Sequence, residues 1–475
     1  MSTHPLQRLS ALAVAGVLAA GWSAAGLAQD DAEPGPDDPR RGVPTTDWRE
    51  SQEVDTMTRD RLIPPGLWRA WLDLPSGHEL SFTLDVDFRR DHFRDPIYGI
   101  NLLNGTDDAI PATITPIEDA ADRQAGEDER LRDFAPDRFE ITFAGSSARV
   151  EATVNEGRLK VVGEYIYERQ TDAGPIEFRV PFSAINSDGR RFDTPEPDAL
   201  EPMPELPEDW AVTFESLEGP AVMTLRVLPD GRHVQGTIAT PTGDDGVLFG
   251  VFHDGRLRMS RFTGTSGLLY DATLQPDGSL IGTFHSLAHH SETFTATPTK
   301  DAALPDLFEQ TRWLDGVSPA ELAFRDTTGA ATTVGDIAPG PSLLYIFGTW
   351  CHNCTDATHY LNELHAVYGD QLSMVGIAFE SPDTFEDQAE RVRRYRESRG
   401  VEFPLLVAGQ RDKSAATETL GALDRLRAYP TFVFVDEDGE VAAVHQGFIG
   451  PADPDRHAAL RSSFDAVIED LLAGS

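Results

Sequence analysis

The sequence predicts a multidomain fold, in which an all-β N-terminal region, sandwich-like or barrel-like and built from two related units, precedes an α/β domain. The chain has 475 residues, more than the roughly 250 to 300 at which a single hydrophobic core stops growing. As far as Lys300, short alternating strands are separated by turn residues, which is typical of all-β structure. From Leu304 onward, strand and helix patterns alternate, which indicates α/β architecture with parallel strands.

The N-terminus has the pattern of a secretory signal peptide, which we assign to residues 1–28. A short n-region ends at Arg8 and is followed by an apolar run and by small residues up to Ala28. Such a run is a poor membrane span, and an uncleaved N-terminal anchor is the alternative. Residues 29–46 are rich in Asp, Pro and Gly and are expected to form a disordered linker. We therefore expect export of the chain, with no stable membrane insertion after cleavage.

Charge and cysteine content narrow the classes of partner and of chemistry. The formal net charge is −39, which argues against nucleic acid and anionic lipid surfaces as partners. The chain has two cysteines, Cys351 and Cys354, whereas exported proteins stabilised by disulfides use several pairs. A disulfide that closes so short a loop stabilises the fold by only on the order of 2 kcal/mol, because it restricts the unfolded chain very little. The pair therefore points to chemistry more than to a structural bridge.

Two β-rich units are predicted, unit 1 at residues 47–194 and unit 2 at residues 208–300, joined by a Pro-rich linker at residues 195–207. Proline cannot donate to a strand ladder, so the linker separates the units. A half-buried strand is indicated by the alternation of Leu80, Phe82, Leu84, Val86 and Phe88 with polar residues. Tight hairpins are indicated by Asn104-Gly105, Asp230-Gly231, Asp254-Gly255 and Asp277-Gly278.

The two units share a short internal similarity. Residues 152–165 and residues 272–284 both have the pattern of a hairpin with glycine at the turn, a second glycine in the returning strand and an aromatic residue that closes it. This similarity is the reason for expecting related units.

A histidine cluster, His285, His289 and His290, lies near a hairpin end of the second unit. It could hold a metal ion, but no carboxylate or cysteine spacing supports one, and exposed loop histidines are commoner. No metal site is therefore predicted.

The α/β domain is assigned to residues 304–475. Its predicted strands are residues 342–348, 372–379, 403–407, 431–435 and 441–445, and its predicted helices run from the second cysteine to Gly369, over residues 385–398, and over residues 456–472. The first of these strands is a continuous apolar run, which is typical of a strand covered on both faces.

Cys351-His352-Asn353-Cys354 lies between that buried strand and a helix start. The helix dipole and unpaired backbone amides can lower a cysteine pKa there from about 8.5 to between roughly 3.5 and 7.5. Cys351 is predicted to be the nucleophile, and Cys354 to attack the resulting mixed disulfide. A zinc site would need further ligands, and haem attachment would need His where Thr355 stands. We predict a redox-active disulfide and no other cofactor.

Trp350-Cys351-His352-Asn353-Cys354, the preceding apolar strand and Tyr429-Pro430-Thr431 resemble the thioredoxin superfamily, most closely the TlpA/ResA-type exported thiol-disulfide oxidoreductases. The similarity covers residues 317–474 and includes the segments GIAFESPDTF, FPLLVAG, RAYPTFVFVDEDGEV and HQGFIGP. It implies a thioredoxin-like fold, protein-disulfide oxidoreductase activity, client proteins with disulfides, and a membrane thiol-reductant donor. It also implies a periplasmic location in a bacterium of Gram-negative type. For the β region the resemblance is looser.

Carried over by position, the resemblance implies roles for three further residues. Pro430 corresponds to the cis-proline that faces the cysteines, Tyr429 to the residue whose backbone pairs with bound peptide, and Trp350 to the residue that covers the nucleophile. An ordinary strand-opening proline and a buried tryptophan at a strand end are the alternatives.

Four positions depart from these relatives or need separate interpretation. Tyr345 stands where thioredoxins have a buried acid, and Ala357 where ResA-type proteins often have Glu. Glu380 ends the next strand, on the active-site edge of a parallel sheet, and is a candidate proton acceptor or else a solvated loop carboxylate. A cationic His352 would stabilise the thiolate of the first cysteine and make the protein more oxidising.

These observations predict an exported thiol-disulfide oxidoreductase that reduces disulfides of periplasmic clients through its CxxC dithiol. The alternatives are a disulfide oxidase or isomerase, which His352 favours, and a β-domain binding protein with an accessory redox domain. A peroxiredoxin is disfavoured, because that family has Pro and Thr where this chain has Leu344 and Gly348.

Overall fold

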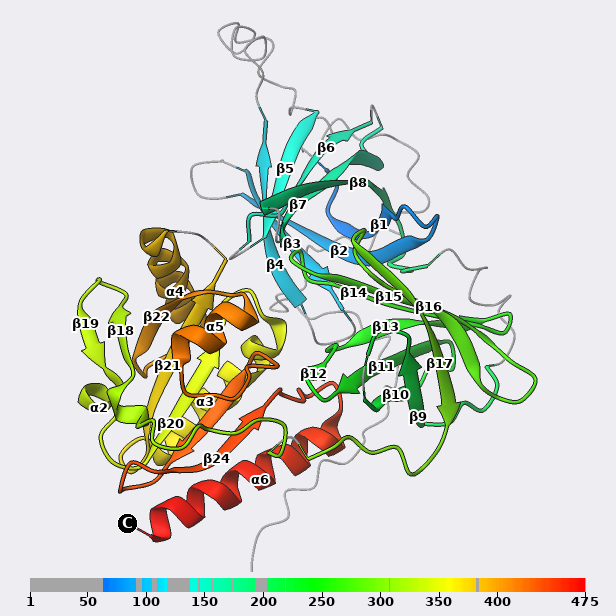
Figure 1. The fold of residues 1–475 in the computed structure, drawn as a ribbon. Coiled ribbons are helices and arrows are strands. Elements are labelled where there is room, and N and C mark those ends of the chain that lie inside the picture. The colour runs from blue at the N-terminus through cyan, green and yellow to red at the C-terminus, as the bar shows by residue number, and fades with distance from the viewer. Residues whose placement is uncertain are drawn as a thin grey trace, which may run out of the picture. The chain divides into compact units, whose positions relative to one another are not determined.

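The computed structural model describes residues 63–90, 96–104, 109–117, 137–143, 146–155, 157–171, 174–192, 203–217, 219–306, 308–381 and 384–474. The predicted signal peptide at residues 1–28, the linker at residues 29–46 and residues 195–202 of the Pro-rich linker lie outside the described residues. The described residues all belong to one compact unit, Thr56–Ser475, and they form two β barrels and an α/β domain (Figure 1).

The first barrel is a closed ring of eight antiparallel strands in chain order, in which β8 pairs back with β1. The strands are β1 (Gly66–Asp73), β2 (Glu79–Arg90), β3 (Pro96–Leu103), β4 (Ala109–Pro116), β5 (Arg138–Phe143), β6 (Arg149–Val154), β7 (Lys160–Thr171) and β8 (Gly174–Asn186). Its core includes the fully buried Trp68, Phe139 and Phe182, because alternate side chains of each strand point inward in a closed barrel.

The second barrel repeats this topology. Eight strands pair antiparallel in chain order, β17 pairs back with β9, and the short β12 pairs antiparallel with the end of β11. The strands are β9 (Asp209–Phe214), β10 (Ala221–Val227), β11 (His233–Thr240), β12 (Gly243–Asp244), β13 (Leu248–His253), β14 (Arg256–Phe262), β15 (Gly267–Leu274), β16 (Leu280–Ser286) and β17 (His290–Pro298). The prediction of two related, barrel-like β units is confirmed.

The internal similarity noted in the sequence marks equivalent hairpins of the two barrels. Gly163 of β7 lies opposite Ala152 of β6, and Gly282 of β16 lies opposite Ala272 of β15. An added Cβ would lie 2.9 Å from the Cβ of the facing alanine at Gly163 and 2.5 Å from it at Gly282. Both positions therefore need glycine for the paired strands to lie this close together. The three predicted Asp-Gly turns also lie between consecutive strands, at β10–β11, β13–β14 and β15–β16, whereas Gly105 is outside the described residues.

From Leu80 to Leu84, strand β2 is buried on both faces, which corrects the prediction of a half-buried strand there, whereas Asp85 and Asp87 are partly exposed. Ser81 and Thr83 are buried as well as their apolar neighbours. The reason is contact with the second barrel, since the hydroxyl of Ser260 in β14 donates to the carbonyl oxygen of Ser81. On its other face, Phe82 stacks on Phe262 at 4.2 Å between ring centroids. Long-range packing thus buries polar positions that the local pattern assigns to solvent.

The α/β domain contains a seven-stranded sheet with the order β19-β18-β22-β21-β20-β23-β24. The strands are β18 (Ala323–Asp326), β19 (Ala331–Thr333), β20 (Ser342–Phe347), β21 (Ser373–Glu380), β22 (Leu405–Gln410), β23 (Thr431–Val435) and β24 (Val441–Gln446). Only β20, β21 and β22 are parallel, so the predicted parallel sheet holds for the centre alone. β23 and β24 are joined by a tight turn, which requires antiparallel pairing.

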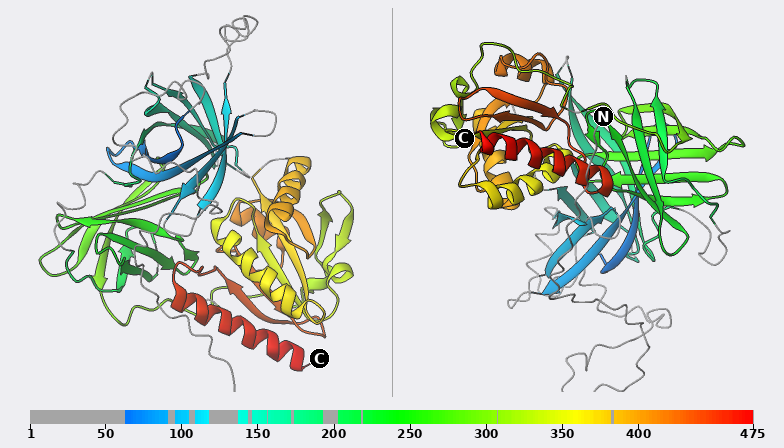
Figure 2. Two further views of the ribbon diagram at one scale, coloured as in Figure 1. Left: turned by 180° about the vertical axis from the view of Figure 1, so that it is seen from behind. Right: turned by 90° about the horizontal axis from the view of Figure 1, so that it is seen from below.

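The helices of this domain are η3 (Pro319–Glu321), α2 (Val334–Ile337), α3 (His352–Tyr368), α4 (Phe385–Arg399), α5 (Lys413–Leu420) and α6 (Pro454–Ala473). Right-handed crossovers from β20 to β21 and from β21 to β22 run in the same direction, so they place α3 and α4 on the same face. Helix α3 lies between α4 and α6 (Figure 2), and the rings of Tyr360 in α3 and Phe464 in α6 are 5.8 Å apart. Within the described ranges, no helix combines the length and the apolar character that crossing a membrane demands.

Candidate active site

Cys351 forms the N-cap of α3, directly after β20. Its backbone is extended, and its sulfur accepts a hydrogen bond from the backbone N–H of Cys354 at 3.2 Å. A sulfur at this position faces the unpaired amides of the first helical turn. The two cysteines form a disulfide, with their Cα atoms 5.2 Å apart. Cys351 is 7% exposed and Cys354 is 0% exposed, so Cys351 is the cysteine that an incoming disulfide can reach.

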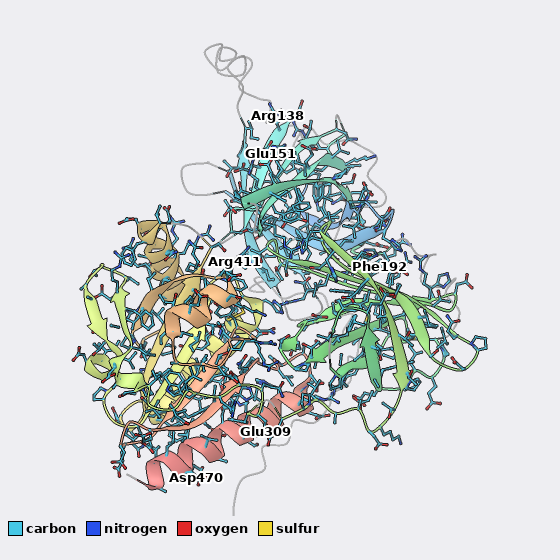
Figure 3. All side chains as sticks on the ribbon, viewed as in Figure 1. Arg138, Glu151, Phe192, Glu309, Arg411 and Asp470 are labelled. Carbon is cyan, nitrogen blue, oxygen red and sulfur yellow. A yellow bond between two sulfur atoms is a disulfide. The ribbon has the colours of Figure 1, made fainter. Side chains whose placement is uncertain are left out.

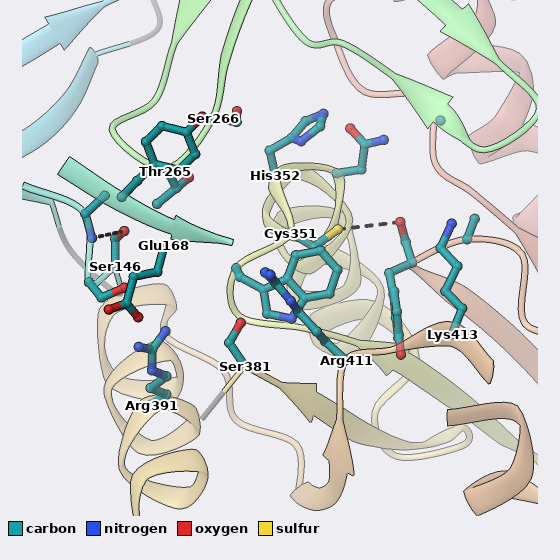
Figure 4. A pocket seen from close by; sticks show the side chains of 18 of the residues that line it. Ser146, Glu168, Thr265, Ser266, Cys351, His352, Ser381, Arg391, Arg411 and Lys413 are labelled. Carbon is teal, nitrogen blue, oxygen red and sulfur yellow. Dashed lines mark hydrogen bonds between the residues drawn. The ribbon is translucent and has the colours of Figure 1, made fainter. Parts of the chain in front are cut away.

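Three residues implied by the resemblance gather around Cys351. The Tyr429–Pro430 peptide bond is cis, and the carbonyl oxygen of Tyr429 lies 3.5 Å from the sulfur of Cys351 (Figure 4). The ring of Trp350 meets that of Tyr429 edge-on, with 5.4 Å between centroids. The indole N–H of Trp350 donates to the carbonyl oxygen of Phe379 at 2.9 Å. The tryptophan is therefore held beside the sulfur by β21 and by the segment before the proline.

A buried hydroxyl cluster, formed by Tyr345, Thr358 and Tyr395, lies against Cys354. The hydroxyls of Tyr345 and Tyr395 donate to the carbonyl oxygen of Cys354 at 2.7 Å and 3.2 Å. The hydroxyl oxygen of Thr358 is 3.0 Å from that of Tyr345 and 2.8 Å from that of Tyr395. Burial raises the pKa of the Cys354 thiol well above its usual range, and the Tyr345 hydroxyl acts in the opposite direction. Neutral hydroxyls thus occupy the place of a buried acid.

Replacing Tyr345 with phenylalanine is expected to slow the second step of disulfide exchange, in which Cys354 attacks. One neutral hydrogen bond is worth about 1 kcal/mol, so the expected change is about fivefold, with the attack by Cys351 unaffected. Acid-quenched time courses that separate mixed disulfide from product measure both steps. Tyr360→Phe serves as the control, because it removes another hydroxyl of α3, which donates to the backbone carbonyl oxygen of Arg461. Slowing of the first step alone would contradict this role.

Glu380 ends β21 and is fully buried, so the alternative of a solvated loop carboxylate is wrong. One carboxylate oxygen accepts from the backbone N–H of Thr349 at 2.8 Å, and the other from the Thr349 hydroxyl at 2.7 Å. Burial raises the pKa of Glu380 from 4.5 to about 7, although both bonds from Thr349 lower it. The carboxylate is bonded to the residue before Trp350 and to neither cysteine, and its role as proton acceptor stays a prediction.

Glu380→Gln is expected to flatten part of the pH dependence of stability. Because its pKa is raised in the folded protein, the folded state binds the proton more tightly, and the free energy of unfolding falls as pH rises from about 4.5 to 7. The variant lacks this fall. Between these pH values, its free energy of unfolding should therefore rise relative to that of wild type by up to about 3 kcal/mol. Urea unfolding of both proteins at pH 5 and pH 8 measures the difference. A difference that does not change with pH would contradict the raised pKa.

His352 is not the cation that its place in the motif suggests. Its Nε2 lies 2.9 Å from the carbonyl oxygen of Asp244, to which the neutral imidazole donates. Burial lowers the pKa of His352 from 6.5 to about 4, and the charge of Arg261 lowers it further. The condition under which His352 would stabilise the thiolate, a positive charge between the cysteines, is therefore not met near neutral pH. The physical reason is that the second barrel covers the imidazole, which no property of the motif itself reveals.

The segment that covers His352 is residues 242–246 of the second barrel, which we call the barrel loop. One carboxylate oxygen of Asp244 accepts from the backbone N–H of Gly450 at 2.5 Å. A Cβ added to Gly243 would lie 2.0 Å from Nδ2 of Asn353, inside the CxxC motif. The barrel loop is therefore packed tightly against the start of α3. Sequence reasoning missed it, because the segment has only the pattern of one more turn between strands.

Cys351 opens onto a cleft with a volume of about 800 Å³ (Figure 4). Both barrels and the α/β domain contribute to its walls, including Ser146, Glu168, Thr265, Ser266, Arg391, Arg411 and Lys413. The β region is thus part of the surroundings of the reactive sulfur, which the sequence did not predict.

The histidine cluster lies at the β16–β17 hairpin end as expected, but His285 is buried instead of exposed. His285 belongs to β16, is 1% exposed, and lies 4.6 Å from the ring of His78. Burial lowers the pKa of His285 to about 4. Across the described ranges, no three His, Cys, Asp or Glu residues are arranged to hold a metal ion.

The sheet order, the CxxC cysteine that caps a helix and the facing cis-proline define a thioredoxin-fold domain whose two cysteines form a disulfide. Residues 317–444 match the AhpC/TSA family. The chain is 26% identical over 133 residues to thioredoxin-like protein YneN of Bacillus subtilis (strain 168), covering 28% of this chain and 72% of that protein. It is 26% identical over 149 residues to thiol-disulfide oxidoreductase ResA of Geobacillus kaustophilus (strain HTA426), and this alignment covers 31% of this chain and 79% of that protein.

Solved structures cover the same domain. A thiol:disulfide interchange protein of the thioredoxin family from Chlorobium tepidum TLS aligns with 34% of this chain and 99% of its own, at 18% identity and a TM-score of 0.24. A DsbF homologue from Corynebacterium diphtheriae aligns with 33% of this chain and 93% of its own, at 21% identity and a TM-score of 0.25. The curated relatives confirm the resemblance to ResA-type thiol-disulfide oxidoreductases for the C-terminal domain.

Proposed function

We propose that the chain is an exported thiol-disulfide oxidoreductase that reduces disulfides of periplasmic client proteins. One observation carries the proposal: Cys351 caps α3, faces the carbonyl oxygen of Tyr429 and opens onto the cleft, while Cys354 is buried directly behind it. This arrangement separates a reachable nucleophile from a protected second thiol, which two-step exchange requires. The relatives of the C-terminal domain named above support the same chemistry.

The reaction proceeds in two displacements. The Cys351 thiolate attacks one sulfur of the client disulfide, so a mixed disulfide forms and one client thiolate leaves. The Cys354 thiolate then attacks the sulfur of Cys351, breaks the mixed disulfide and releases the second client thiolate. Each released thiolate takes a proton from solvent. The client gains two electrons, and the Cys351–Cys354 disulfide that results is reduced again by a membrane thiol-reductant donor.

The direction of the reaction depends on the relative stability of the dithiol and the disulfide. A cationic His352 was the reason for considering an oxidase or isomerase, and the neutral imidazole removes that support. A reduction potential of about −270 mV, on the order of that of thioredoxin, is expected, whereas about −120 mV would overturn the reductase proposal. Equilibration with glutathione buffers of known potential measures it.

Cys354→Ser is expected to trap clients as mixed disulfides with Cys351. The serine cannot carry out the second displacement, so the covalent intermediate accumulates. The measurement is non-reducing electrophoresis of the variant exported with its signal sequence, followed by identification of clients released by reductant. Cys351→Ser/Cys354→Ser provides the background. Equal capture by the single and double variants would contradict the proposal.

A further inference from the structure

Two cations from one short segment flank Cys351 in the cleft. Arg411 follows β22, and its backbone N–H donates to the carbonyl oxygen of Glu380 at 2.9 Å. Lys413 is the first residue of α5. Figure 4 shows Arg411 below Cys351 and Lys413 to its right, and Figure 3 shows Arg411 beside α5. An anion held by these two side chains would therefore lie next to the reactive sulfur.

Neither Arg411 nor Lys413 forms an ion pair within the described part of the chain, and Glu380 is the carboxylate whose charge acts on the guanidinium of Arg411. The guanidinium of Arg411 lies over the Trp350 ring at 5.3 Å, and Nζ of Lys413 donates to the carbonyl oxygen of Arg427 at 2.5 Å. Both partners are uncharged, and neither cation has an ion pair with a described residue. Lys413 is one of three lysines in the chain and stands at a helix N-terminus, where the helix dipole disfavours a cation. Helix stability therefore does not explain its position.

Further positive charge lies close to Arg411. Burial is the main reason that the pKa of Arg411 is lowered, and the charges of Arg169 in β7 and Arg391 in α4 lower it further. Such an accumulation of like charges is unexpected in a chain with a net charge of −39. On the barrel side, the cleft presents the hydroxyls of Thr265 and Ser266, which are neutral hydrogen-bond donors. An anion in the cleft would thus meet cations on the wall of the α/β domain, and these hydroxyls together with Glu168, Asp244 and Asp245 on the walls of the barrels.

The acidic residues that line the cleft are Glu168, Asp244, Asp245, Asp387 and Glu390. Asp244 accepts from the backbone N–H groups of Gly246 and Gly450, Asp245 accepts from the hydroxyl of Tyr270, and Asp387 accepts from the hydroxyl of Thr384. Glu390 forms ion pairs with Arg393 at 2.6 Å and Arg394 at 2.8 Å. The carboxylate of Glu168 lies beside Arg391 and away from Cys351 (Figure 4). Arg411 and Lys413 are therefore the charges that remain for a substrate beside the sulfur.

From this arrangement we propose that Arg411 and Lys413 form a carboxylate-binding subsite, and that preferred substrates are disulfides with acidic groups next to the reacting sulfur. The inference rests on the proposed disulfide exchange and specifies its substrate class. A cleft of about 800 Å³ is in the range that holds a drug-sized ligand or a few peptide residues. Acidic segments of client proteins and small dicarboxylate disulfides share this chemistry. Charge-assisted bonds to carboxylates supply the selectivity.

The test uses the reduced full-length protein and single-turnover exchange. Disulfide-linked peptides of equal length carry Glu, Gln or Lys on both sides of the cysteine. Oxidised glutathione, which has two carboxylates on each half, is the small acidic disulfide, and 2-hydroxyethyl disulfide is a neutral probe of thiol reactivity. We expect wild type to react about tenfold faster with the Glu peptide than with the Gln peptide at low salt, and more slowly with the Lys peptide. The preference should shrink at high salt.

The matched variants remove the same charges at two places. Arg411→Gln/Lys413→Gln should reduce the Glu-to-Gln rate ratio to about one, whereas Lys300→Gln/Arg312→Gln, outside the cleft, should keep it. Taking the ratio removes any effect of the lost cations on the reactivity of Cys351 itself, which 2-hydroxyethyl disulfide reports separately. If oxidised glutathione reacts as fast as the Glu peptide, the subsite accepts small acidic disulfides. If it reacts more slowly than the Glu peptide, the subsite selects acidic segments of peptides.

Two results would overturn the inference. One is exchange by wild type with no preference for the Glu peptide, and the other is equal loss of preference in both double variants. Absence of exchange with every disulfide, including the neutral probe, would instead contradict the proposed function. The two failures are therefore distinguishable in one set of rates.

Discussion

Replacing Cys351 with serine is expected to lower the rate of disulfide exchange by at least about a thousandfold, because a hydroxyl is not ionised near neutral pH and is a far weaker nucleophile than a thiolate. The fold should survive, since serine is among the best N-cap residues and can accept the hydrogen bond that the sulfur now accepts from the backbone N–H of Cys354. Single-turnover exchange with a peptide disulfide gives the rate. Urea unfolding under reducing conditions checks that stability is retained.

The companion variant Cys354→Ser distinguishes the roles of the two cysteines. It should still form a mixed disulfide at a rate close to that of wild type, because Cys351 keeps its place at the helix start, and it should fail to complete the turnover. The buried position of Cys354 behind Cys351 is the reason for this asymmetry. The reverse pattern, with Cys354→Ser unable to start the reaction and Cys351→Ser able to, would show that the roles are exchanged.

Gly243→Ala is expected to cause the second-largest effect, although the residue belongs to a barrel and not to the redox domain. Gly243 has a φ of +130°, and an added Cβ would lie 2.0 Å from Nδ2 of Asn353 and 3.2 Å from the carbonyl oxygen of Phe448. The unfavourable backbone conformation costs on the order of 1–3 kcal/mol. Relief of the overlap displaces either the barrel loop or Asn353, so the exchange rate should also fall about tenfold, since small displacements at a reacting group are costly.

Gly278→Ala is the matched control for this prediction. Gly278 lies in the same barrel at a positive φ of +85°, and an added Cβ there would have nothing within 4 Å. It should lose roughly 1–2 kcal/mol of stability from the left-handed conformation without any change in exchange rate. Thermal unfolding and single-turnover rates of the two variants give the comparison. Equal rates for both would mean that the barrel loop does not support the site.

Structural elements that depend on residues close together in the sequence were predicted well. The strand before Cys351, the cap formed by Cys351 and the helix that ends with Tyr368 are set by local hydrophobic periodicity and by helix-end chemistry. The Asp-Gly turns between barrel strands are likewise local, since glycine relieves the strain of a positive φ. For such elements the predicted and observed positions agree closely.

The proton environment of Cys354 shows where local reasoning ends. Tyr345 was noticed because it replaces an acid, and Thr358 lies one helical turn beyond Cys354, a spacing that could have indicated it. Tyr395 comes from α4 and reaches the same carbonyl oxygen only because α3 and α4 share a face of the sheet. No pattern around the CxxC motif contains that information.

By itself, the sequence determined that the chain has two related β units and a thioredoxin-like domain with a CxxC cysteine pair, because these features depend on periodicity, turn chemistry and a short motif. Only the tertiary structure decided that His352 is neutral, that Glu380 is buried and that a loop of the second barrel closes over the start of α3. The physical reason is that charge state and access are set by burial. Burial at this site is produced by residues more than a hundred positions away, such as Asp244 against His352.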